Sequence, residues 1–146
     1  MGGLLKLMAE DAADLEIIAA AAQDALVRMG DVTYDSKARR FAALINRFRW
    51  EAADESAKNF ERVRAALSFE GVLAVKSRRV RQDAPEALAS ILSIVFTPDE
   101  EPPGGVVRIV LAGGGEIELH VECLDALLMD LGASWRTPRR PDHEQS

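Results

Sequence analysis

The chain has few of the residue types on which several common protein classes depend. Cys123 is its single cysteine, which excludes an intrachain disulfide and a zinc site built on several cysteines. Aromatic residues make up only 5% of the 146 residues, so the core has to be built mainly from alanine, valine, leucine and isoleucine. No run of 18 apolar residues occurs, and acidic residues interrupt the first 22 positions, where a signal peptide needs a basic start and an unbroken apolar run. We therefore expect a cytoplasmic protein without a membrane span.

Apolar residues make up 48% and charged residues 29% of the chain, a composition typical of a folded protein. The length favours one domain, which we place at residues 1–135. Residues 136–146 contain two prolines and three arginines and are expected to form an extended tail. Trp135 would anchor the end of the domain, although a tail of this kind is also suited to docking a partner.

Charge is unevenly distributed along the chain. Residues 37–81 hold twelve basic and five acidic side chains, a net charge of +7, whereas the remainder carries a net charge of −13. The overall charge of −6 disfavours non-specific binding of nucleic acid. The basic middle has two interpretations that stay open: it packs against the acidic parts and is neutralised by them, or it faces an anionic ligand.

The first half of the chain alternates between helical and strand patterns. Residues 4–8 predict a short strand. Residues 12–23 predict an amphipathic helix that begins after Asp11 as the N-cap. Alternating apolar residues from Ala25 to Tyr34 predict a strand, Asp35 begins a turn, and residues 39–50 predict a long strand.

Two hairpins are predicted from their glycines. A loop at residues 69–71 would place Gly71 in the left-handed conformation and pair two strands so that one face is apolar. The pairs on that face are Leu67 with Leu73, Ala65 with Val75, and Val63 with Ser77. A loop at residues 112–114 would build the second hairpin. Its expected pairs are Ile109 with Ile117, Val107 with Leu119, and Arg108 with Glu118 on the outer face.

The rest of the pattern completes an antiparallel fold. Residues 87–96 are apolar enough for a strand buried on both faces, and residues 97–105 predict a loop. Residues 122–131 predict a helix, because Leu124, Leu127, Leu128 and Leu131 form one stripe before Gly132. We expect an α+β, mainly antiparallel fold of about seven strands in a pleckstrin-homology-like, partly open barrel, with a C-terminal capping helix and an extra N-terminal helix. The alternative is a sandwich with both helices on one face of a single sheet.

Three stretches resemble a known family. They are residues 121–132 with Trp135, Thr137, Pro141 and His143; Arg39–Phe41 with Asn46–Trp50; and Arg62–Leu67. Together they are similar to an uncharacterised bacterial family of about this length, known only as a domain of unknown function. The resemblance covers nearly the whole chain and implies a conserved cytoplasmic protein. It implies no activity and no catalytic residues.

The predicted hairpin generates the main candidate site, a basic face. Its register sets Arg62 opposite Arg78 and Arg64 opposite Lys76, and like charges so opposed are destabilising unless solvated or bound to an anion. Arg47 and Arg49 would extend the patch on a neighbouring strand, with Phe48 and Trp50 in the core on the other side. The predicted binding residues are Arg47, Arg49, Arg62, Arg64, Lys76 and Arg78.

His120 and Cys123 form a second candidate site, because a Cys–His pair can catalyse nucleophilic chemistry. The competing interpretation makes Cys123 a small buried residue at a helix start. It places His120 on an outer strand face beside Glu116 and Glu118. We predict no metal site, because a metal needs three or more ligands, and the motifs indicate no cofactor.

The residues favour a non-enzymatic binding or adaptor module that presents an arginine-rich strand face to an acidic protein or anionic ligand. Two alternatives stay open. One is a small enzyme that uses the His120 and Cys123 region. The other is a homodimeric structural protein paired through an exposed strand edge.

Overall fold

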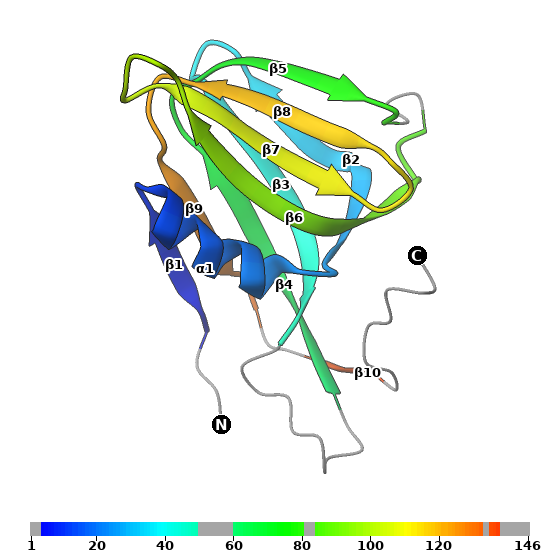
Figure 1. The fold of residues 1–146 in the computed structure, drawn as a ribbon. Helices are drawn as coiled ribbons and strands as arrows, with labels where there is room; N and C mark the ends of the chain where they lie inside the picture. Colours follow the sequence, from blue (N-terminus) through cyan, green and yellow to red (C-terminus); the bar gives the residue numbers. More distant parts are fainter. Residues whose placement is uncertain (1–3, 50–59, 81–83, 133–134, 138–146) are drawn as a thin grey trace.

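The computed structural model describes residues 4–49, 60–80, 84–132 and 135–137, which form one strongly curved antiparallel sheet and one helix (Figure 1). The first half contains β1 (Lys6–Ala9), α1 (Ala12–Ala22), β2 (Leu26–Asp35), β3 (Arg40–Phe48) and β4 (Phe60–Phe69). The second half contains β5 (Val72–Arg78), β6 (Leu88–Pro98), β7 (Gly105–Leu111), β8 (Glu116–Val121), β9 (Ala126–Asp130) and β10 (Trp135–Thr137).

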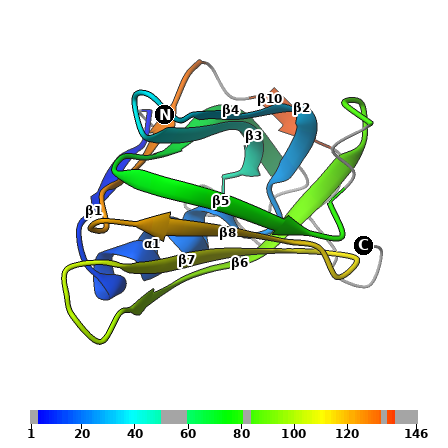
Figure 2. The ribbon, with the colours of Figure 1, turned by 90° about the horizontal axis from the view of Figure 1, so that it is seen from above.

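The strand order along the sheet is β1-β9-β4-β3-β2-β6-β7-β8-β5, and β10 adds to the side of β4. Strand β2 joins the two halves, because its first residues pair with both β3 and β6. Its last residues pair with β3 alone, after an irregularity between Val27 and Val32. The view from above shows the sheet curling so that β5 comes round toward β2 and β3 (Figure 2). The sheet therefore has two terminal strands, β1 and β5, and does not close.

The core lies inside this curl. Each strand turns alternate side chains inward, as in Phe41, Ala43 and Ile45 of β3, which are all less than a tenth exposed. Helix α1 packs against β1 and β6 and adds Leu15, Ile18 and Ala22 to the core. Its start is capped as predicted, because the Asp11 carboxylate accepts a hydrogen bond of 2.8 Å from the backbone N–H of Asp14.

The coarse fold class and the second hairpin are confirmed. The chain is mainly antiparallel sheet with an N-terminal helix, and β7 pairs with β8 in the predicted register, with Ile109 opposite Ile117. On the outer face Arg108 donates to Glu118 over 2.9 Å. The pattern was sufficient there because the two strands are adjacent in sequence and in the sheet.

The first predicted hairpin is wrong. Strand β4 is paired with β3 on one edge and with β9 on the other, so it has no free edge for β5, which pairs with β8 instead. Gly71 has the predicted positive φ of 67°, but it turns the chain from one half of the sheet to the other. Space there is tight as well, because a Cβ at Gly71 would lie 3.0 Å from the side chain of Glu122.

The predicted C-terminal helix is also wrong. Residues 126–130 form β9, an inner strand held between β1 and β4. Leucines lie on both faces of this strand: Leu128 points into the core, while Leu127 on the outer face is only partly buried. Apolar residues on two faces of a short strand imitate the spacing of a helical stripe, which explains the error.

Three further expectations need correction. Strand β6 is not buried on both faces, because Leu88, Leu92 and Val95 are 66%, 38% and 52% exposed. Strand pairing extends through Thr137, two residues into the predicted tail, while residues 138–146 lie outside the described part of the chain. With ten strands and a strand in place of the capping helix, the chain lacks the features that suggested a pleckstrin-homology-like barrel, and a sandwich with two helices does not fit the single helix of the described residues.

Candidate functional site

The structure does not bring the six predicted binding residues to one face. Arg47 and Arg49 are buried at 0% and 7% exposure, and Arg62 is half-buried. Arg64 is exposed on β4, opposite Asn46 of β3 rather than Lys76 of β5. Lys76 and Arg78 lie on β5, in the other half of the sheet. The opposed pairs on which the basic face depended do not exist, because β4 and β5 are not neighbours.

Arg47 belongs to the core-facing side of β3, where it continues the alternation of Phe41, Ala43 and Ile45. Its Nε and Nη2 donate to the two carboxylate oxygens of Asp130 on β9, each over 2.8 Å. Both side chains are essentially inaccessible to water. In register, Arg47 stands opposite Val63 of β4 and Asp130 stands opposite Ala65 of the same strand, so the ion pair spans β4.

The same carboxylate accepts a third hydrogen bond of 2.8 Å, from the backbone N–H of Leu5. The ion pair therefore ties β3 and β9 to the segment that leads into β1. A paired and fully hydrogen-bonded buried charge of this kind is a structural element. Arg47 is assigned to the framework of the fold and not to a binding surface.

Arg49 and Arg62 are also held internally. Arg49 donates to both carboxylate oxygens of Glu61, over 3.2 and 3.1 Å. Arg62 donates to the backbone oxygen of Asn46 over 3.0 Å. Burial lowers the pKa of the Arg62 guanidinium, and the negative charge of Asp24 acts in the opposite direction. These groups close the end of the curled sheet with charges that already have partners.

Much of the basic middle segment is neutralised in this way. Further ion pairs join Arg39 to Glu122 over 2.8 Å and Arg40 to Glu70 over 2.7 Å. Arg64 approaches Asp31 at 3.8 Å. The packing interpretation therefore accounts for most of this segment. Among the described residues, four cations of the same segment have no ionic partner: Lys37, Lys76, Arg78 and Arg79. The last three lie on β5 or directly after it.

Lys76 and Arg78 belong to a charge pattern on the outer face of β7, β8 and β5. Arg108 of β7 binds Glu116 and Glu118 of β8, at 3.5 and 2.9 Å. The same two glutamates lie in register with Arg78 and Lys76 of β5. In register, Glu118 therefore stands between Arg108 of β7 and Lys76 of β5, whereas Glu116 stands between Val110 of β7 and Arg78 of β5. The pattern stops at β5, where the sheet ends.

In the second candidate site, His120 lies on the predicted strand face, but Cys123 is not buried as predicted. His120 lies on the outer side of β8, and its Nε2 is 3.7 Å from a carboxylate oxygen of Glu118. Cys123 is exposed in the connection between β8 and β9, not buried at a helix start. Among the residues that the structure describes, no group of three His, Cys, Asp or Glu side chains is placed to hold a metal ion.

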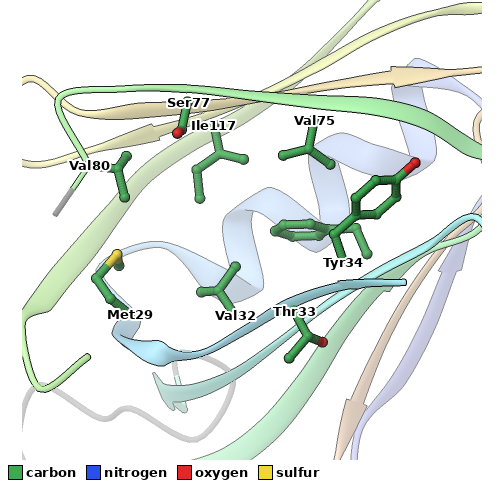
Figure 3. A pocket seen from close by; sticks show the side chains of 9 residues that line it. Met29, Val32, Thr33, Tyr34, Val75, Ser77, Val80 and Ile117 are labelled. Carbon is green, nitrogen blue, oxygen red and sulfur yellow. The ribbon is translucent and has the colours of Figure 1, made fainter. Parts of the chain in front are cut away.

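A cleft that the sequence did not predict lies between β5 and β2, where the curled sheet fails to close. It has a volume of about 270 Å³ and a mainly apolar lining. Val75 and Val80 line one side and Met29 and Val32 the other (Figure 3). Phe41 and Ile117 also line it, and Phe41 belongs to the core, so that the cleft opens onto the hydrophobic interior.

The cleft is closed at one end and continues at the other. The Tyr34 hydroxyl donates to the backbone oxygen of Val72 over 2.8 Å, which ties β2 to the start of β5. Toward the end of β5, a second hollow of about 150 Å³ shares Met29 and Val80 with the cleft and reaches the side chain of Arg79. The whole groove therefore runs from Tyr34 to Arg79.

The cleft could not be predicted from the sequence, because its existence depends on which strands do not pair with each other. The apolar residues that line it, such as Val32 and Val75, are indistinguishable in the sequence from core residues. A partial signal was present in β2, where Gly30 and Asp31 interrupt the alternation and mark the irregularity in its pairing with β3.

Comparison with known proteins places the chain in one family and gives no functional assignment. No curated protein and no solved structure matches it. Within the described residues no helix is long and apolar enough to cross a bilayer. A family model described as a protein of unknown function, DUF2948, matches residues 5–143, which include every strand and the helix. The chain therefore belongs to the DUF2948 family.

Proposed function

We propose that the protein is a non-enzymatic binding module that accepts an apolar group of an anionic partner in the cleft between β2 and β5. The observation that carries the proposal is an unfilled, mainly apolar cleft beside Lys76, Arg78 and Arg79, three cations on or next to β5 that lack ionic partners among the described residues. Binding sites are typically apolar concavities with a few polar groups that fix orientation. The proposal keeps an acidic protein or an anionic ligand as the partner and moves its site from the strand face to the cleft.

The charge of the partner follows from the position of these cations. Lys76 and Arg78 are exposed on β5, which forms one wall of the cleft, and Arg79 lies at its far end. An anion that approaches the cleft is attracted by all three, whereas a cation is repelled. The module acts in the cytoplasm on this proposal, which is the compartment expected from the sequence.

A small aromatic anion provides a direct test. 1-Anilinonaphthalene-8-sulfonate combines an apolar ring system with a sulfonate, and its fluorescence rises when it leaves water. We expect saturable binding at one site per chain. Val32→Trp, which fills the cleft, should weaken that binding about tenfold, the effect of losing one buried apolar contact.

The matched control is Val95→Trp, the same change on the exposed face of β6 and away from the cleft. It should leave binding unchanged, and both variants should retain a cooperative thermal transition. If Val32→Trp fails to fold, Val75→Trp fills the cleft from the opposite wall. Equal binding by the cleft and control variants would refute the proposal.

A further inference from the structure

We infer that the partner is an extended peptide segment that adds to the free edge of β5, with acidic side chains on its outer face and apolar side chains in the cleft. The inference rests on the proposed function and names the class of partner. It follows from the direction in which each residue of β5 points.

The free edge comes from the sheet order. Strand β5 is the last strand of the path and pairs only with β8 within the described residues. In an antiparallel sheet, alternate residues of a strand direct their N–H and C=O groups to opposite neighbours. An edge strand therefore offers a row of backbone donors and acceptors to an incoming strand.

The side chains of β5 divide between the two faces of the sheet. Val75 and Ser77 line the cleft, while Lys76 and Arg78 lie on the outer face in register with Glu118 and Glu116. A strand added beside β5 follows the same alternation, because its residues stand opposite those of β5. Every second side chain of the partner would enter the cleft, and the others would lie beside Lys76 and Arg78.

The charge pattern then selects acidic residues for the outer positions. Glu116 and Glu118 are already bound by Arg108 from β7. Lys76 and Arg78 therefore have no ionic partner on the side of β8, and the next strand is where the alternating pattern supplies one. Opposite charges directly across two strands are stabilising.

The elongated shape of the groove favours an extended segment over a compact molecule. The space continues past Val80 into the second hollow, which matches the linear course of a peptide. A compact cofactor would leave that extension empty.

The test uses three synthetic hexapeptides with both ends blocked. The first alternates glutamate and valine, the second contains the same residues in two blocks, and the third alternates lysine and valine. Binding is followed through the amide signals of the ¹⁵N-labelled protein. The alternating acidic peptide should shift the signals of Leu73–Arg78 and protect their amides from exchange, and it should bind about tenfold more tightly than either other peptide.

Reversing the two charges on β5 should reverse the peptide preference, which provides a control in which binding of a new peptide is gained. The double variant Lys76→Glu with Arg78→Glu should lose the acidic peptide and bind the lysine–valine peptide instead. Arg64→Glu, a single charge reversal at an exposed position on β4, should leave the preference unaltered. Equal binding of the alternating and block peptides, or no reversal in the double variant, would overturn the inference.

Sodium decanoate separates failure of the inference from failure of the proposed function. If decanoate shifts the signals of Val32 and Val75 while no peptide does, the cleft binds small anions, and the peptide inference is wrong although the proposed function stands. If neither ligand perturbs these residues, both proposals fail. If the acidic alternating peptide binds and competes with decanoate, both are supported.

Discussion

Breaking the buried ion pair between Arg47 and Asp130 should cost more stability than any exposed ion pair in the chain. Asp130 is only 4% exposed, and in Arg47→Ala its carboxylate keeps only the backbone N–H of Leu5 as a donor. An uncompensated buried charge of this kind destabilises a protein by about 3–5 kcal/mol. With an unfolding entropy typical for this chain length, that loss lowers the melting temperature by roughly 10–16 °C.

The measurement is denaturant unfolding followed by circular dichroism, together with thermal melting. Arg108→Ala is the matched control, because it removes an arginine from an ion pair that is 39% exposed on the arginine side. It should cost at most about 1 kcal/mol. The double variant Arg47→Met with Asp130→Leu should recover at least half of the loss, since no charge is then left unpaired in the interior. A loss in Arg47→Ala no greater than that in Arg108→Ala would refute the structural role of the pair.

Two further predictions concern sites that were proposed from the sequence. Arg62→Glu should destabilise the protein by about 1–3 kcal/mol, because it removes the donor to the Asn46 carbonyl and places a carboxylate at a half-buried site. Arg64→Glu should change stability by less than about 0.5 kcal/mol, and equal melting temperatures for the two variants would contradict the assignment. Cys123 should react with iodoacetamide in the folded protein at nearly the rate found in denaturant, and strong protection in the folded state would contradict its exposure.

Local patterns predicted the elements whose partners are close in sequence. Alternation with a glycine loop was enough for β7 and β8, and an N-cap with an apolar stripe was enough for α1. Val63, Ala65 and Leu67 are buried as expected, so the phase of β4 was also predicted correctly. What the sequence does not contain is the identity of the neighbour, since an apolar strand face fits many partners equally well.

The arginines were predicted on the wrong face for the same reason, because the sequence does not identify the partner of a side chain. Continuing the alternation of Phe41, Ala43 and Ile45 puts position 47 on the core side, but a charged residue there is interpreted as exposed unless its partner is known. The partner, Asp130, lies 83 residues away in a segment predicted as a helix. The sequence contained one indication against that helix, because Asp130 would lie near its C-terminus, where an acidic residue is unfavourable. Knowledge of this one long-range ion pair would therefore have placed Arg47 in the core and argued against a helix that ends near Asp130.

The cations of β5 also bear on self-association through this edge. An exposed edge strand is a template for pairing with another copy of itself, and basic residues are a common means of preventing it. If two β5 strands paired antiparallel, Lys76 and Arg78 of one copy would lie beside the same residues of the other, because both belong to the outer face. Like charges so placed are destabilising, whereas an acidic strand at the same position extends the alternating pattern. On the proposed function, the charges that disfavour a homodimer at β5 are also the charges that attract an acidic partner, and both effects come from the same two residues.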